Sequence, residues 1–90
     1  MLTPEDRESL RRAAREILAS RPGNSFPLPG IRRRIEQGKL VDCKFADDDL
    51  RAALSLLLGL EHIATTRDPL GATEYFTATA AGILAFERGE

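Results

Sequence analysis

The sequence is poor in the residues that build disulfides and metal sites. It has no tryptophan and only one cysteine, Cys43, and one histidine, His62. A lone cysteine excludes an internal disulfide and fits a reducing compartment. One cysteine and one histidine are too few for a zinc site, and nothing in the sequence places them together as a nucleophile and its base. We therefore expect no metal, no cofactor and no enzymatic activity.

Long apolar runs are also missing. No stretch approaches the roughly 18 apolar residues that cross a bilayer. Residues 1–12 lack the charged-then-apolar pattern of a signal peptide. With 42% hydrophobic and 30% charged residues in a chain of 90, the composition is that of a soluble globular protein. We expect one domain over residues 1–90, with a single small core and a cytoplasmic location.

Charge is unevenly distributed along the chain, although the net charge is only -1. Residues 1–44 hold ten basic and six acidic side chains, whereas residues 45–90 hold three and eight. Such a polarised surface gives information about binding partners rather than about the fold.

Capping signals and apolar spacing predict three helices in residues 3–60. Thr3 and Pro4 suit the start of the first helix, which Pro22 and Gly23 end. Its core face recurs at helical spacing, and consists of Leu10, Ala13, Ala14, Ile17 and Leu18. The second helix is expected from about Pro29 to Gln37, with Gly38 as its stop. Ile31 and Ile35 are its inward pair, and Leu28 is a further candidate for the core.

The third predicted helix covers residues 46–60. Its core face is expected to contain Leu50, Ala53, Leu54, Leu57 and Leu60. Asp47, Asp48 and Asp49 lie in the first turn, where negative charge interacts favourably with the helix dipole. Phe45, just before the helix, is expected to pack against Leu50.

The last third of the chain predicts a β-hairpin and a helix. Residues 62–67 and 73–78 are rich in threonine, isoleucine and aromatic side chains, which favour strands. The sequence DPLG between them has the proline and glycine placement of a type I turn. Thr79 suits the N-cap of a final helix that contains Ile83, Leu84 and Phe86.

This order of elements resembles a known family. Leu54 and Leu57 lead into a strand from Ile63, a turn over residues 67–72 and a second strand, and residues 79–82 (TAAG) form a Thr-x-x-Gly step. In these features the chain resembles the winged helix-turn-helix domains of bacterial transcription regulators over nearly its whole length. The resemblance implies an α+β, mostly helical fold with a three-helix core, a β-hairpin wing and a C-terminal helix.

The resemblance also implies a way of binding double-stranded DNA. The third helix would enter the major groove, and the wing would touch the backbone or the minor groove. On the helix face opposite the core leucines, Arg51 and Ser55 are able to hydrogen-bond a base edge or a phosphate. The candidate phosphate contacts are Arg67 in the wing, together with Arg32, Arg33, Arg34 and Lys44.

Other residues favour a different partner. Asp47–Asp49 at the start of the third helix would repel phosphates, and Asp68 and Glu74 flank the wing. Arg7, Arg11 and Arg15 form one stripe, which is either an ordinary solvated surface or a patch for nucleic acid or an acidic protein.

The alternative function is therefore a winged-helix module for protein–protein contact without DNA. Leu56 and Leu58 flank the core stripe of the third helix, so either other helices cover them or they meet a partner. By the resemblance, Ile83, Leu84 and Phe86 are candidates for a homodimer interface.

Overall fold

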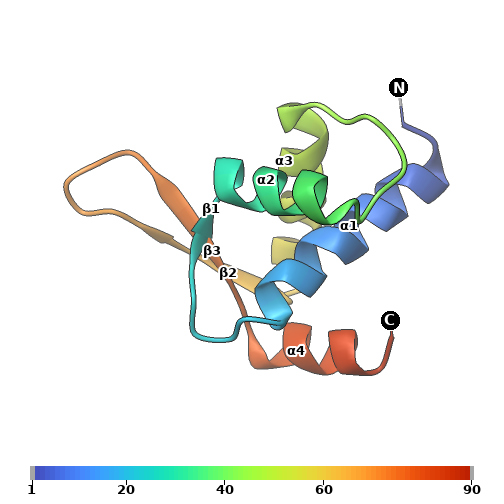
Figure 1. Ribbon diagram of the computed structural model, residues 1–90. Helices are drawn as coiled ribbons and strands as arrows, with labels where there is room; N and C mark the ends of the chain where they lie inside the picture. Colours follow the sequence, from blue (N-terminus) through green and yellow to red (C-terminus); the bar gives the residue numbers. More distant parts are fainter. Residues whose placement is uncertain (1, 90) are drawn as a thin grey trace.

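The computed structural model describes residues 2–89 and has four helices and three strands within this range (Figure 1). In chain order they are α1 (Pro4–Ala19), β1 (Phe26–Pro27), α2 (Leu28–Gly38), α3 (Asp47–Gly59), β2 (Ile63–Arg67), β3 (Glu74–Ala78) and α4 (Ala80–Glu87). The predicted α+β, mostly helical architecture is confirmed, with β1 as an addition. None of the described helices has the length and apolar character needed to cross a lipid bilayer.

The start of α1 is fixed by the predicted cap. The Thr3 hydroxyl accepts a hydrogen bond from the Asp6 amide at 3.1 Å, and the Asp6 carboxylate accepts one from the Thr3 amide at 3.3 Å. This reciprocal pair satisfies two amides that the helix itself leaves without partners. Pro4, at the first helical position, has no amide hydrogen to satisfy.

One hydrophobic core joins the three long helices and the sheet. The side chains that are almost completely buried are Leu10, Leu18, Ile31, Ile35, Leu50, Leu54 and Leu57. Leu28 and Phe45 pack against this core from its edge, as the sequence predicts. Leu60 was expected in the core and is 53% exposed. That prediction is wrong because α3 ends at Gly59 and the chain turns away, with Glu61 in the left-handed region at φ 61°.

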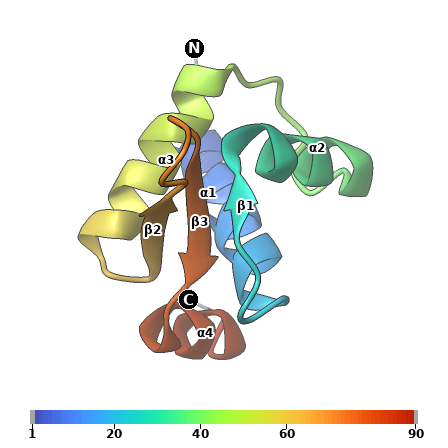
Figure 2. The ribbon, with the colours of Figure 1, turned by 90° about the vertical axis from the view of Figure 1, so that its left-hand side faces the viewer.

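The sheet has three antiparallel strands in the order β1-β3-β2 (Figure 2). The hairpin register pairs Arg67 with Glu74 and Ile63 with Ala78. On the other side of β3, Phe26 pairs with Phe76, whose side chain is buried. The sequence analysis predicts no strand at Phe26. A two-residue strand has no periodicity of its own and forms only because β3 lies beside it.

The wing extends away from the helices. In Figure 1 the loop between β2 and β3 points to the left, while α1, α2 and α3 pack on the right and α4 lies below them. Figure 2 looks toward this side and shows β3 between its two neighbours, with α4 beneath the sheet. The tip of the wing therefore stands apart from the helices.

Candidate nucleic-acid interface

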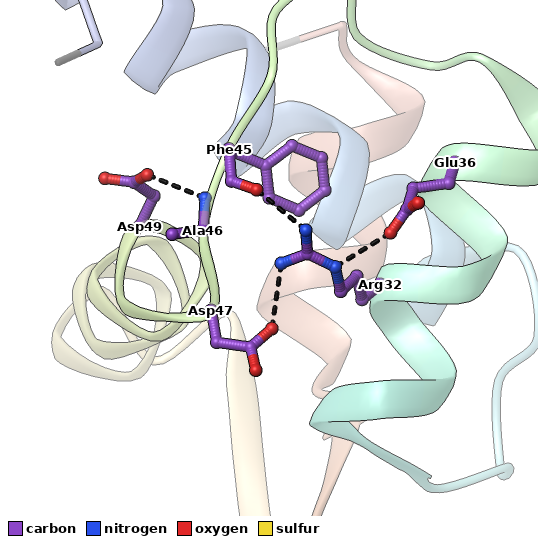
Figure 3. Close-up of polar contacts among 6 residues, drawn as sticks. All are labelled: Arg32, Glu36, Phe45, Ala46, Asp47 and Asp49. Carbon is purple, nitrogen blue, oxygen red and sulfur yellow. Dashed lines mark hydrogen bonds and ion pairs between the residues drawn. The ribbon is translucent and has the colours of Figure 1, made fainter.

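Arg32 holds α2 against the start of α3 (Figure 3). Its guanidinium donates hydrogen bonds of 2.8 Å from Nε to Glu36 Oε1, from Nη1 to Asp47 Oδ1 and from Nη2 to the carbonyl oxygen of Phe45. The same group lies 4.8 Å from the centre of the Phe45 ring. All three guanidinium nitrogens already have partners within the protein. Arg32 therefore holds α2 in position against the start of α3.

Two of the three carboxylates in the first turn of α3 have partners within the protein. Asp47 is paired with Arg32, and the carboxylate of Asp49 accepts a hydrogen bond of 2.9 Å from the amide of Ala46 (Figure 3). Asp48 is exposed. Two of the three carboxylates therefore stabilise the start of the helix, and Arg32 offsets the charge of one of them, Asp47.

The exposed face of α3 carries the residues predicted to read DNA. Arg51, Ala52 and Ser55 are exposed, whereas Leu50 and Leu54 are buried on the opposite side. The side chains of Ala52 and Ser55 are small, so this face is able to come close to base edges. Arg51 and Ser55 offer hydrogen-bond donors to them.

The basic residues around α2 are placed in different ways. Arg33 is exposed beside an open cleft of about 420 Å³ between α2 and the first turn of α3. Arg34 is half-buried, and its guanidinium lies 4.6 Å from the centre of the Phe26 ring. Lys44 is exposed in the connection between the two helices. Arg33 and Lys44 are thus accessible to a phosphate, and Arg34 is held against β1.

The wing ends in the turn that the sequence DPLG predicts. The Gly71 amide donates to the carbonyl oxygen of Asp68 at 3.2 Å, which closes the turn. The Asp68 carboxylate accepts from the Leu70 amide at 3.0 Å, and the Asp68 amide donates to the carbonyl oxygen of Thr73 at 3.2 Å. Arg67 is exposed at the base of this loop, directly opposite Glu74. Asp68 therefore stabilises the loop through these hydrogen bonds, next to Arg67.

Arg15 lies in the interior, contrary to its expected place in a surface stripe. Its residue is only 7% exposed, and Nη1 donates to Nδ1 of His62 at 3.2 Å. Since a guanidinium has no acceptor, Nδ1 of His62 must carry the lone pair in this contact. The surface stripe on α1 is thus reduced to Arg7 and Arg11. Helical spacing could not single out Arg15, because Arg7, Arg11 and Arg15 each lie three residues before a buried side chain.

The candidate interface residues fall into two groups. On α3, Leu58 packs against the edge of the core, and Leu56 is 45% exposed in a groove of about 360 Å³ beside Arg7 and Arg11. On α4, Ile83 and Phe86 are half-buried and Leu84 is exposed. The two groups border different hollows: Leu56 lies in the one beside α1, and Phe86 in one beside Leu40.

The reactive side chains form no common site. Within residues 2–89, no three histidine, cysteine, aspartate or glutamate side chains gather closely enough to hold a metal ion. Cys43 lies in the connection between α2 and α3, where burial raises the pKa of its thiol and the carboxylate of Asp6 raises it further. The sulfur is therefore held as the protonated thiol, which is a weak nucleophile.

Comparison with known proteins supports the fold without sequence relatives. No family model matches the chain. No curated protein matches it either. Among solved structures, the C30AH42A mutant of ZitR from Lactococcus lactis, in its apo form, superimposes with a TM-score of 0.70 at 15% identity, covering 94% of this chain and 57% of that one.

Two further structures show the same likeness. The adhesin competence repressor AdcR from Streptococcus pyogenes has a TM-score of 0.64 at 14% identity, with 86% of this chain and 51% of that one covered. S. aureus MepR, solved in a complex with DNA, has a TM-score of 0.66 at 15% identity, with 98% and 61% covered. The chain spans between half and two thirds of the length of these proteins. It has a winged helix-turn-helix fold.

Proposed function

We propose that the chain is a small DNA-binding module of a transcription regulator. The observation that carries the proposal is the composition of the exposed face of α3. Arg51 and Ser55 point outward there, while Asp47 and Asp49 are engaged in bonds within the protein. The likeness to S. aureus MepR, which was solved with DNA, supports the same direction.

We assign the contacts as follows. Arg51 and Ser55 face base edges in the major groove, because a helix of this width fits there and arginine pairs well with guanine. The phosphate contacts are Arg33, Lys44 and Arg67, which are all exposed. Arg34, half-buried against Phe26, is the remaining candidate for a contact with the backbone. Arg32 serves DNA binding indirectly, since it positions the start of α3.

The expected affinity is modest and sensitive to salt. Asp48 and Glu74 remain exposed near the proposed contacts and oppose phosphates. Few phosphate contacts therefore have to supply the non-specific binding, for which a dissociation constant of about 10⁻⁴ to 10⁻⁶ M is typical.

The test is fluorescence anisotropy of a labelled random-sequence duplex, titrated at low and near-physiological salt. Arg33→Ala should weaken binding and reduce the slope of affinity against salt by about 1, because it removes one phosphate contact. Arg51→Ala should weaken binding as well, and should cost about 1–3 kcal/mol on a preferred site once one has been selected.

Arg12→Ala is the matched control, since it removes the same charge from an exposed side chain of α1 that pairs with Glu8 at 3.2 Å. Equal losses in Arg12→Ala and Arg33→Ala would mean that only net charge matters. Absence of binding at low salt, up to about 10⁻⁴ M protein, would reject the DNA proposal.

A second function, contact with another protein, is favoured by one specific observation. Leu56 on α3 and Leu60, which caps the end of that helix, are large, exposed and both border α1. We further propose that α4 supports a homodimer through Ile83, Leu84 and Phe86, and dimers of such folds commonly present two reading helices to one DNA.

A further inference from the structure

We propose that Leu70 is an apolar wedge, which the wing inserts between base pairs in the minor groove so that the bound DNA kinks. This inference rests on the proposed DNA binding. It assigns a function to the tip of the wing. Leu70 is neither one of the proposed DNA contacts nor part of the hydrophobic core.

Leu70 is exceptional in its exposure. It is 99% exposed, whereas the other exposed large hydrophobic residues lie between 37% and 53%. Burying a leucine side chain is worth about 1.5–3 kcal/mol, and at this position none of that stabilisation is obtained within the chain. The side chain is thus available in full to a partner.

The loop presents this leucine in a defined position. The Leu70 amide is held by the Asp68 carboxylate at 3.0 Å, and the next amide, of Gly71, is held by the Asp68 carbonyl oxygen at 3.2 Å. The pair formed by the Asp68 amide and the Thr73 carbonyl oxygen closes the loop at 3.2 Å. A tip that is ordered before binding loses less conformational entropy when it is inserted into a narrow groove.

The chemistry of the tip fits a wedge better than a clamp on phosphate. Residues 68–73 contain no lysine or arginine, and the nearest cation is Arg67 at the base. Proteins that enter the minor groove often insert leucine, phenylalanine or proline between base steps, which unstacks them and bends the duplex by about 20–90°. Arg67 would neutralise a phosphate beside the groove while Leu70 enters it. Figure 1 shows that this loop points away from the helices.

The experiment uses a duplex with 2-aminopurine at a flexible TA step and a donor and acceptor dye at its two ends. With the unaltered chain we expect 2-aminopurine fluorescence to rise on binding, because the base becomes unstacked, and end-to-end transfer to report a bend of about 20–90°. Leu70→Ala should abolish both signals and leave the salt slope unchanged, since no phosphate contact is lost.

Leu70→Phe is the matched control, because it restores an apolar wedge of sufficient size and should restore both signals. If Leu70→Ala bends and unstacks DNA as the unaltered chain does, the wedge is rejected and the DNA proposal stands. If the chain binds DNA with no rise in fluorescence and no bend, the wedge is likewise rejected. If no DNA is bound at any salt concentration, both proposals fail together.

Discussion

At the scale of single residues, a glycine, Gly82, allows α4 to pack closely against the rest of the molecule. Gly82 is buried against the chain reversal that follows α3, and a Cβ atom there would overlap the carbonyl oxygen of His62. The Thr79 hydroxyl accepts from the Gly82 amide at 3.1 Å and donates to the carbonyl oxygen of Glu61. The Thr-x-x-Gly step was visible in the sequence, but the backbone that Gly82 touches was not.

Gly82→Ala tests this contact. We expect a loss of about 3 kcal/mol in the free energy of unfolding, because the overlapping atom is backbone and cannot rotate away. Chemical denaturation followed by circular dichroism measures the loss.

Gly59→Ala is the control for that measurement. It makes the same substitution at the end of α3, where nothing lies within 4 Å of the added Cβ atom. It should leave stability unchanged or raise it by up to about 1 kcal/mol. Equal stability of the two variants would show that the close approach at Gly82 does not constrain the fold.

At the scale of elements, the sequence predicted the helices and the hairpin well and the short or irregular pieces poorly. The periodicity of α1 and α3 and the turn chemistry of the wing are local signals, and those elements were found. β1 depends on pairing with a strand about fifty residues away in the chain, so no local signal exists for it. The end of α2 was also misplaced. Gly38 was predicted as the stop, whereas the helix includes it and Lys39 adopts the left-handed conformation at φ 51°.

Lys39→Gly follows from this ending. A residue with a Cβ atom is strained at φ 51°, and glycine is not, so the variant should be more stable by about 1 kcal/mol. The midpoint of thermal unfolding should rise by a few degrees. Lys39→Ala removes the same charge and keeps the Cβ atom, and it should give no gain. A gain of the same size from both variants would assign the effect to the lysine side chain.

At the scale of the whole molecule, the separation of charge along the chain does not become a simple division of the surface. Arg15 and Arg32, two basic residues of the first half, have partners within the protein: Arg15 is buried with His62, and Arg32 is paired with Asp47 from the second half. The candidate DNA residues Arg33, Lys44, Arg51 and Arg67 are exposed, as their polar character predicts. Composition could not reveal which arginines would be paired or buried within the protein, because that depends on packing between elements distant in sequence.

The apolar surface of α4 predicts self-association. Leu84 is 48% exposed on a helix whose residues 80–86 are all apolar or glycine. The outer side of this helix therefore has few polar side chains to hydrogen-bond with water. Leu84→Glu should shift a dimer toward monomer in sedimentation velocity, because a charge at such an interface is costly to bury. Leu70→Glu makes the same change on the wing and should not alter the sedimentation coefficient. A monomer in the unaltered chain at high concentration would rule out the α4 interface.

The three-stranded sheet is also protected against growth at one of its edges. β1 occupies that edge and is only two residues long, and its second residue, Pro27, has no amide hydrogen to offer. An incoming strand would find almost nothing to pair with there. The short strand β1, which pairs with β3 through Phe26, therefore also covers this edge of the hairpin. Strands of other chains cannot add to the sheet there and start aggregation.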